Sequence, residues 1–329
     1  MSRDAELYPT PGNPLPGKAK VGHFQGADGR RLRYAVFRGE EGPVRGTVVL
    51  LHGRNEAIEK YFELIGGFLQ RGLWVATFDW RGQGASDRLI ERLPRRGHVR
   101  RFADYERDLE AFLQQVVLPD TRLPFFLLGH SMGGLVALSQ APKLSGRIDR
   151  MVLSAPFVAL GGQALNEGRV VALAGTASLL GFGTFPLTRD RGPRPFSANP
   201  LTSDPQRFAR GEGLAEAHPH LALGPPSARW LYETLSAMRR VRRQEHLTDI
   251  TIPTLILAPT RDPLVPYAAL EALAAQFRAS TLIPIVGARH EVLQEADRYR
   301  DQALAAIEAF FPGSVDSGLP QQIEEATAV

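Results

Sequence analysis

Residues 123–134 read LPFFLLGHSMGG, an apolar run followed directly by Gly129, Ser131 and Gly133. A serine with a glycine two residues away on either side, at the end of a buried strand, has the form of a nucleophile elbow. The turn from strand into helix is so tight that a Cβ atom at Gly129 or Gly133 would collide with neighbouring backbone. The strain lifts the Ser131 hydroxyl to a helix N-terminus, where developing negative charge is stabilised. This stretch predicts acyl transfer to water through a serine ester.

The size and composition of the chain are those of a folded globular protein. It has 329 residues, of which 43% are hydrophobic and 22% charged, enough for one large α/β domain with an insertion or for two ordinary domains. It has no cysteine, so disulfides, thiolate metal sites and cysteine nucleophiles are excluded. The first residues lack a basic region followed by an apolar stretch, so we expect no secretory signal and a cytoplasmic location.

Short apolar runs alternate with helical patterns along most of the chain. A hairpin with its turn at Asp28 and Gly29 comes first, and six runs without an exposed face follow at 47–51, 73–78, 125–128, 151–154, 254–258 and 282–286. Apolar residues recur at helical spacing between them, for example over 102–116 and 296–310. Strand–helix–strand units in series predict an α/β fold with a mostly parallel central sheet flanked by helices.

Breaks in this alternation predict the domain boundaries. Residues 157–250 contain many glycines and prolines, no good strand and helical pieces such as 228–240. We expect them to form a helical cap inserted over the carboxyl edge of the sheet, where open α/β sheets bind ligands. The other predicted parts are an N-terminal arm (1–22), a core in two segments (23–156 and 251–312) and a flexible tail (313–329).

A serine nucleophile needs a base, and the base needs an acid that orients it. After a nucleophile elbow, the acid and then the histidine come later in the chain. Asp262 follows the strand pattern at 254–258, and His290 follows the one at 282–286, so both should lie on loops at the same sheet edge as Ser131. We expect His290 to take the Ser131 proton and Asp262 to hold the imidazole tautomer.

Other histidines and carboxylates are weaker candidates for these roles. His130 lies inside the elbow and is expected to face the wrong way to act as the base. Asp79 also ends a strand, but it precedes Ser131 and is expected to order the turn at 81–84. Four further histidines in helical or turn contexts are expected at the surface, namely His98, His218, His220 and His246.

Ester hydrolysis also needs N–H donors aimed at the tetrahedral oxyanion, and losing one donor costs about 10²–10³ in rate. The first expected donor is the backbone N–H of Met132, directly after the nucleophile. The second should come from the loop after 47–51, where we expect the N–H of Arg54, the residue after Gly53. The backbone N–H donates this hydrogen bond, so the role does not depend on which side chain residue 54 carries.

Two features bear on contact with lipid. The formal net charge is +4, and arginines cluster over 88–101, 189–194 and 239–243. We interpret these clusters as a solvated, salt-bridged surface; the alternative is a rim that attracts anionic phospholipid, at about 1 kcal/mol per arginine. Nucleic-acid binding is not expected, because no recognition motif accompanies the charge. Residues 170–188 carry no charge but are interrupted by glycine and proline, which predicts a buried or lipid-facing lid segment rather than a membrane span.

The chain resembles serine hydrolases of the α/β-hydrolase superfamily, and more narrowly the bacterial lysophospholipase and monoacylglycerol lipase group. The likeness spans about residues 24–310 and is carried by segments 52–61, 79–86, 97–105 and 129–134, and by Asp262 with His290. It implies the α/β-hydrolase fold, a lid over an acyl pocket, no cofactor, and a substrate with one fatty acyl chain on glycerol or glycerophosphate. Arg54 replaces the small residue usual in monoacylglycerol lipases, which favours a phosphate-bearing head group.

These observations predict a carboxylic ester hydrolase that works through an acyl-enzyme, most specifically a lysophospholipase. The alternatives are a monoacylglycerol lipase or a small-molecule carboxylesterase with the same triad. A more remote alternative is a non-catalytic ligand-binding protein on a hydrolase scaffold. The expected partner is a small lipid or ester substrate, with peripheral contact at the inner face of the membrane; the sequence leaves the oligomeric state open.

Overall fold

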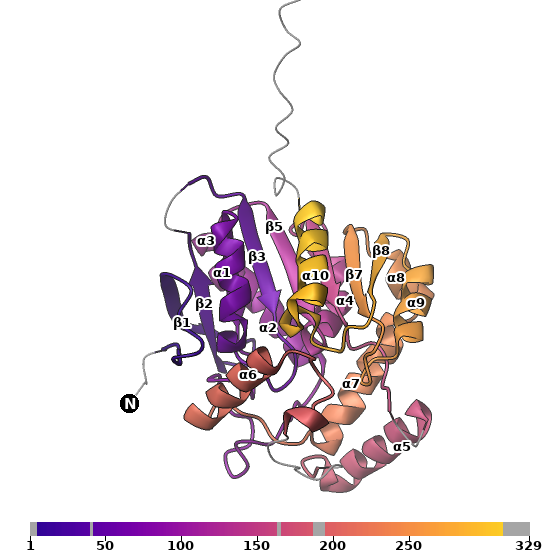
Figure 1. Cartoon of the computed structure of the whole chain (residues 1–329). Helices are drawn as coiled ribbons and strands as arrows, with labels where there is room; N and C mark the ends of the chain where they lie inside the picture. Colours follow the sequence, from indigo (N-terminus) through magenta and orange to yellow (C-terminus); the bar gives the residue numbers. More distant parts are fainter. Residues whose placement is uncertain (1–4, 40–41, 163–165, 187–194, 312–329) are drawn as a thin grey trace, which may run out of the picture.

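The computed structural model describes residues 5–39, 42–162, 166–186 and 195–311, which form an eight-stranded sheet in the order β1-β2-β4-β3-β5-β6-β7-β8 (Figure 1). The strands are β1 (Ala19–Gln25), β2 (Arg31–Phe37), β3 (Gly46–Leu51), β4 (Leu73–Phe78), β5 (Phe125–His130), β6 (Arg150–Ser154), β7 (Thr254–Pro259) and β8 (Ser280–Ile285). The pairs β1–β2 and β2–β4 are antiparallel, and all other neighbours are parallel. The predicted mostly parallel α/β sheet is confirmed.

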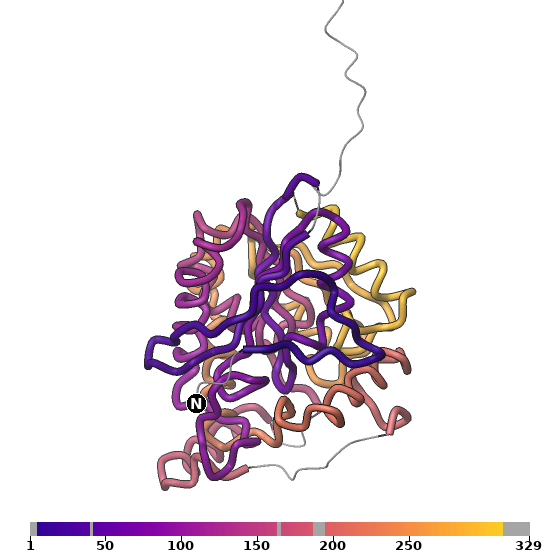
Figure 2. Tube along the Cα trace, turned by 90° about the vertical axis from the view of Figure 1, so that its left-hand side faces the viewer, coloured from indigo at the N-terminus to yellow at the C-terminus, as the bar shows by residue number. Residues whose placement is uncertain are grey.

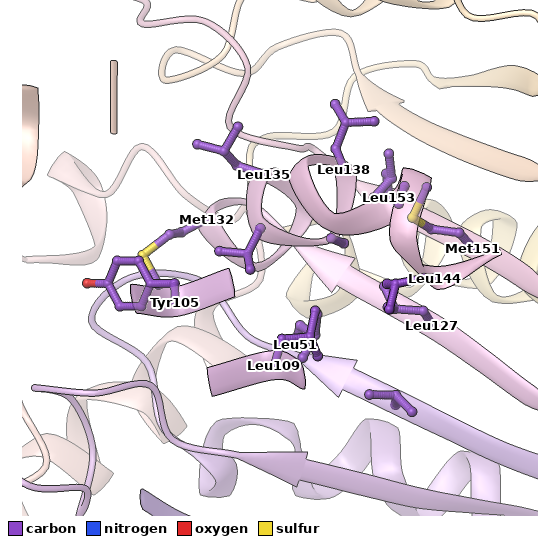
Figure 3. Close-up of a cluster of buried hydrophobic side chains, with 14 of the residues drawn as sticks. Leu51, Tyr105, Leu109, Leu127, Met132, Leu135, Leu138, Leu144, Met151 and Leu153 are labelled. Atoms are coloured by element: carbon purple, nitrogen blue, oxygen red, sulfur yellow. The ribbon is translucent and has the colours of Figure 1, made fainter. Parts of the chain in front are cut away.

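Helices cover both faces of this sheet. On one face, α1 (Phe62–Gln70) and α10 (Asp297–Phe310) pack on side chains such as Val48 and Leu50. On the other face, Val49 and Leu51 belong to the apolar layer that also contains side chains of α2 (Ala103–Phe112), α4 (Met132–Leu144) and α9 (Tyr267–Gln276). Figure 3 shows this second layer, with Leu144 of α4 near Leu127 of β5 and Leu109 of α2 near Leu51 of β3. Successive residues of β3 serve opposite layers, so the strand reads as a continuous apolar run.

The described part of residues 157–250 consists of helices joined by loops and contains no strand. Their helices are α5 (Glu167–Ala177), η3 (Ser178–Phe182), η4 (Phe196–Ala198), α6 (Pro205–Ala217), α7 (Ala228–Val241) and α8 (Gln244–Thr248). Asn166, Asp204 and Ser227 cap the N-termini of α5, α6 and α7 with their side chains, as short polar residues do when they accept an orphan N–H. Helices α5, α6 and α7 lie beyond the carboxyl ends of the parallel strands (Figure 1).

The structure corrects the expectation that all six strands lack an exposed face, and it does not bury the described part of the predicted lid segment. β8 is an edge strand with partly exposed residues, because it has a neighbour on one side alone. The apolar stretch from 170 lies largely at the surface as far as 186, where its description stops, and Leu179 is 87% exposed. No helix among the described residues is long and apolar enough to cross a membrane.

The N-terminal residues lie on the core and near α6 (Figure 2). The Tyr8 N–H donates to Glu59 Oε1 at 3.1 Å, and the Asn13 side chain donates to the Glu59 carbonyl at 2.7 Å. The Tyr8 ring packs against His218 and His220, with centroid distances of 4.9 and 4.8 Å. β1 begins at Ala19, inside the expected arm. The tail predicted at 313–329 lies outside the described residues.

Between α2 and β5, the chain forms the π-helical turn η2 (Leu113–Val117) and the short helix α3 (Leu118–Asp120). Single 3₁₀ turns follow two of the loops at the carboxyl edge, η1 (Ile58–Tyr61) after β3 and η5 (Val292–Gln294) after β8. The loops after β3, β5, β7 and β8 therefore meet at this edge, which is where the candidate site residues lie.

Candidate active site

Ser131 stands on a strained turn between β5 and α4. Its backbone has φ 49° and ψ −114°, a conformation that L-residues rarely adopt. A Cβ atom at Gly129 would lie 2.8 Å from the Gly134 Cα atom, and one at Gly133 would lie 2.2 Å from the Leu51 carbonyl oxygen. Both glycines are therefore required by contact with backbone, and the turn presents the Ser131 side chain at the carboxyl edge of the sheet.

Three side chains from separate loops form one hydrogen-bonded chain. Ser131 Oγ lies 2.9 Å from His290 Nε2, and His290 Nδ1 lies 2.6 Å from Asp262 Oδ2. The other carboxylate oxygen, Oδ1, accepts the N–H groups of Leu264 and Val265 at 2.7 and 3.1 Å. The carboxylate is thus fixed, and His290 Nδ1 carries a proton toward it. Nε2 is then the nitrogen that can accept the Ser131 hydroxyl proton.

The structure also links the loop after β3 to the start of α4. The Asn55 N–H donates to Gln83 Oε1 at 2.8 Å, and Gln83 Nε2 lies 3.8 Å from Met132 Sδ. The Met132 side chain points toward Tyr105 of α2 (Figure 3). Since the Asn55 N–H is occupied, Arg54 is the residue after Gly53 whose backbone N–H has no acceptor among the described residues.

A buried ion cluster, which the sequence reasoning missed, supports the same loop. Glu56 Oε2 accepts the Gly53 N–H at 2.6 Å and the Tyr61 hydroxyl at 2.7 Å. Lys60 Nζ lies 2.7 Å from Glu56 Oε1 and 2.6 Å from Glu291 Oε1. Burial alone would raise the pKa of Glu56, but Lys60, His130 and His52 together outweigh it and hold this pKa well below its ordinary value. The cluster ties the loop after β3 to the residue that follows His290.

His130 does not contact Ser131 through a hydrogen bond. Its Nδ1 faces the Ser154 carbonyl oxygen at 3.2 Å, and its ring centroid lies 5.0 Å from that of His290. Burial lowers the pKa of His130 to about 4, since the charged imidazole would lose its hydration. A neutral His130 is therefore part of the packing around His290.

The expectation that the other four histidines are surface residues holds fully for His220 and only in part for the other three. His98 Nδ1 lies 2.9 Å from Ser227 Oγ, and His246 Nε2 lies 2.9 Å from the Leu138 carbonyl oxygen. These two and His218 are partly buried, and His220 is exposed. The residues that cover them come from distant parts of the chain, so local sequence context did not reveal their burial.

Asp79 holds the turn after β4, as its position suggested. Asp79 Oδ2 accepts Arg33 Nε at 2.7 Å and the Ala85 N–H at 2.8 Å. A Cβ atom at Gly84 would lie 2.2 Å from Asp79 Oδ2, so the turn needs a glycine there. Burial opposes ionisation, but the Arg33 guanidinium and His52 lower the pKa of Asp79 to about 2.

The arginine clusters differ in their pairing. Arg239, Arg240 and Arg242 form ion pairs, with Glu167, Glu106 and Glu167 respectively. No arginine in 88–101 has a carboxylate of a described residue within salt-bridge distance. The salt-bridged interpretation thus fits the first group and not the second. The arginines at 189–194 lie outside the described residues.

Comparison with known proteins places the chain in a family. The model of the family described as serine aminopeptidase, S33, matches residues 42–297. The chain belongs to this family. It is 30% identical to the probable lysophospholipase L2 of Haemophilus influenzae over 294 residues, covering 88% of this chain and 90% of that protein. It is 31% identical to lysophospholipase L2 of Escherichia coli K12 over 303 residues, covering 88% and 86%.

Solved structures agree with this assignment. The monoacylglycerol lipase of Paleococcus ferrophilus has a TM-score of 0.67 and 25% identity, covering 85% of this chain and 98% of that chain. A soluble variant of the Saccharomyces cerevisiae monoglyceride lipase has a TM-score of 0.73 at 20% identity, covering 94% and 100%; this second likeness concerns the fold. The predicted resemblance to the lysophospholipase and monoacylglycerol lipase group is confirmed, and the protein is an α/β-fold serine hydrolase.

Proposed function

We propose that this serine hydrolase cleaves the ester of single-chain lipids through an acyl-enzyme on Ser131. The observation that carries the proposal is the chain of hydrogen bonds from Ser131 Oγ through His290 to Asp262, with distances of 2.9 and 2.6 Å. Nucleophile, base and orienting acid at such distances are what nucleophilic catalysis of acyl transfer needs.

In the first half of the reaction, Ser131 Oγ attacks the ester carbonyl while His290 Nε2 takes its proton. The N–H groups of Arg54 and Met132 stabilise the tetrahedral oxyanion. His290 then gives the proton to the glycerol oxygen as the carbon–oxygen bond breaks, leaving an acyl-serine. In the second half, water attacks the acyl carbonyl, with His290 again as the base, and the fatty acid leaves Ser131 free.

We infer that the substrate is a lysophospholipid. The two relatives described above are named probable lysophospholipase L2 and lysophospholipase L2, and a cationic residue, Arg54, occupies the loop after β3. Monoacylglycerol is the alternative, supported by the Paleococcus ferrophilus structure at 25% identity. The two substrates differ in one group, the head-group phosphate.

We further propose that residues 157–250 form a cap and that its outer surface meets anionic phospholipid. Large apolar side chains are exposed on α5, η3 and the turn after it: Leu173, Leu179, Leu180, Phe182 and Phe185 are 52–87% exposed. Arg229 connects this region to the unpaired arginines of 88–101, since its N–H donates to the Gly183 carbonyl and its Nε to the Arg100 carbonyl. An apolar patch beside unpaired cations is suited to an anionic bilayer.

The test of the reaction is fatty acid release from lysophosphatidylcholine and monoacylglycerol with the same acyl chain, by wild type and Ser131→Ala. We expect Ser131→Ala to lose about 10⁴–10⁶ in kcat and to lose labelling by a fluorophosphonate probe. Preference for the lysophospholipid supports the inferred substrate, and preference for the monoacylglycerol replaces it. A folded wild type that the probe does not label would contradict the acyl-enzyme.

The test of the membrane surface is sedimentation with vesicles of phosphatidylglycerol and phosphatidylcholine. Leu179→Ser combined with Phe182→Ser should reduce binding to the anionic vesicles. Substitution of Leu118, which is 48% exposed on α3 and lies outside the proposed surface, serves as the matched control. Equal binding by all three proteins would rule out this surface.

A further inference from the structure

A cleft of about 200 Å³ lies between the loop after β3 and α6. Arg54 and Asn55 line it on the side of the loop, Phe208 and Glu212 line it on the side of α6, and Glu291, the neighbour of His290, also lines it. Its volume is below the roughly 300–1,000 Å³ of pockets for drug-sized ligands. It is thus of a size for a polar head group beside the loop after β3 and the residue that follows His290, and too small for a whole lipid.

Most charged side chains that line the cleft are already neutralised by neighbours. Lys60 pairs with Glu56 at 2.7 Å and with Glu291 at 2.6 Å. Arg207 donates from Nε and Nη2 to the two oxygens of Glu63, at 2.9 and 2.7 Å. These groups shape the cleft and offer little net charge to a ligand.

Arg54 is different, because no carboxylate of a described residue pairs with it. Its Nη2 donates to the Gly224 carbonyl, and its guanidinium lies over the Trp230 ring, 5.2 Å from the centroid. Its Nε is buried and has no hydrogen-bond partner. Burial lowers the pKa of Arg54 to about 10, which still leaves a full positive charge at neutral pH. By contrast, buried Arg33 has both Glu59 and Asp79 as partners.

Glu212 is an anion that, like the cation Arg54, has no partner of opposite charge among the described residues. It is exposed on α6, lines the same cleft, and has no ion pair or side-chain hydrogen bond with another described residue. The charged groups that the cleft leaves uncompensated within the described chain are therefore one cation, on the side of the oxyanion loop, and one anion, on the side of α6.

We propose that this cleft is the head-group site for a zwitterionic lysophospholipid, in which Arg54 binds the phosphate and Glu212 binds the ammonium. A planar guanidinium suits a phosphate, whose oxygens accept its N–H groups, and a carboxylate pairs with the ammonium of ethanolamine or choline. In the substrate, the phosphate is nearer than the ammonium to the reacting ester. In the cleft, the cation is likewise on the side of the oxyanion loop, and the anion is on the side of α6. The inference rests on the proposed ester hydrolysis and specifies its substrate class.

The kinetic test compares three substrates with one acyl chain, all presented as monomers: lysophosphatidylethanolamine, lysophosphatidic acid and monoacylglycerol. For Arg54→Gln we expect kcat/KM for both phosphate-bearing substrates to fall at least 10-fold relative to that for monoacylglycerol, and Arg54→Lys to restore part of the loss. For Glu212→Gln we expect a 3- to 10-fold fall for the ethanolamine substrate relative to lysophosphatidic acid. Glu216→Gln, also exposed on α6 but outside the cleft, is the control and should change neither ratio.

A binding test separates failure of this site from failure of the proposed substrate. Glycerophosphoethanolamine, the head group without its acyl chain, should inhibit hydrolysis of p-nitrophenyl butyrate competitively. Its inhibition constant should rise at least 5-fold in Arg54→Gln and at least 3-fold in Glu212→Gln. This readout needs an active serine and does not need lysophospholipid to be the preferred substrate.

Two results would overturn the head-group site. One is a loss of activity in Arg54→Gln that is equal for all three substrates, because Arg54 would then only clamp the loop to Gly224 and Trp230. The other is no inhibition of the wild type by glycerophosphoethanolamine. If inhibition is present but no single-chain lipid is hydrolysed, the head-group site stands and the proposed reaction fails.

Discussion

Two histidine–aspartate contacts lie at the carboxyl ends of strands in this sheet, and their surroundings differ. After β7, Asp262 Oδ2 lies 2.6 Å from His290 Nδ1, and the other side of the imidazole reaches Ser131. After β4, Asp79 Oδ1 lies 3.5 Å from His52 Nε2, and both side chains are fully buried. The same two residue types thus occur once beside a nucleophile and once within the core.

The difference lies in what neutralises each carboxylate. Asp79 has the Arg33 guanidinium as well as the N–H groups of Ile58 and Ala85. Asp262 has two backbone N–H groups, and His290 is its one ionisable partner among the residues that the structure describes. A permanent cation makes a fixed structural charge, whereas an imidazole can gain and lose a proton during a reaction. Asp79 therefore carries a structural charge, whereas Asp262 is placed to act on a histidine that changes its protonation state.

The largest effect should come from Asp262→Asn. The amide would donate where the carboxylate accepts, so His290 would be held in the wrong tautomer and kcat should fall about 10⁴-fold. Hydrolysis of p-nitrophenyl butyrate measures it, with thermal unfolding as the check on folding. A fall of less than 10-fold in a folded variant would mean that Asp262 does not orient the base.

Asp79→Asn should act on stability instead. Asp79→Asn leaves Arg33 paired with Glu59 but weakens the hydrogen bonds that Asp79 accepts from Arg33, Ile58 and Ala85, which should cost about 1–3 kcal/mol in the free energy of unfolding. Urea unfolding measures this cost. For the molecules that remain folded, kcat should fall far less than in Asp262→Asn. The contrast between the two aspartates would be wrong if Asp79→Asn had the same free energy of unfolding as the wild type but lost as much kcat as Asp262→Asn.

A third histidine–carboxylate contact gives a pH dependence. His130 Nε2 lies 3.9 Å from Glu56 Oε1, and burial lowers the pKa of His130 to about 4, below its ordinary value of about 6.5. The unfolded chain binds this proton first, so stability falls as pH drops from about 6.5 to 4, by up to about 3 kcal/mol. Urea unfolding at pH 7, 5.5 and 4.5 should show a smaller fall in His130→Asn. The same fall in both proteins would assign the loss to other groups.

The smallest effect should come from the surface. The Arg242–Glu167 pair is 2.6 Å long with side chains 33% and 22% exposed. Solvent screens such a pair, so Arg242→Gln should cost about 1 kcal/mol or less in the free energy of unfolding, and high salt should reduce that cost further. A loss as large as that of Asp79→Asn would show that exposure does not separate these two kinds of ion pair.

Much of the site could be predicted because its determinants are local. The apolar run before Gly129 and the two glycines around Ser131 specify a strand and a turn through steric contact alone. Asp262 and His290 each follow a strand, and parallel strands end at one edge of a sheet, so strand order along the chain was enough to bring them near Ser131. The burial of strands on both faces made those strands recognisable as continuous apolar runs.

The ion clusters could not be predicted in this way. Lys60 and Glu291 are 231 residues apart in the chain, and Arg54 and Gly224 are 170 apart. Whether a charged residue finds a partner at such separations depends on how helices and loops pack, and residue spacing carries no record of it. For this reason the arginines at 239–243 are largely salt-bridged and those at 88–101 have no ion pair with a described residue, although the two clusters look alike in the sequence.

By itself, then, the sequence determined the fold, the strained turn at Ser131 and the identity of its candidate partners, because steric limits and hydrophobic burial act over a few residues and repeat with each strand. The packing of distant segments settles which charges are neutralised, how Glu56 and Lys60 support the loop after β3, and that Arg54 and Glu212 line one cleft with no ion-pair partner among the described residues. Charge pairing acts through space over a few ångströms, and the chain order does not contain those distances.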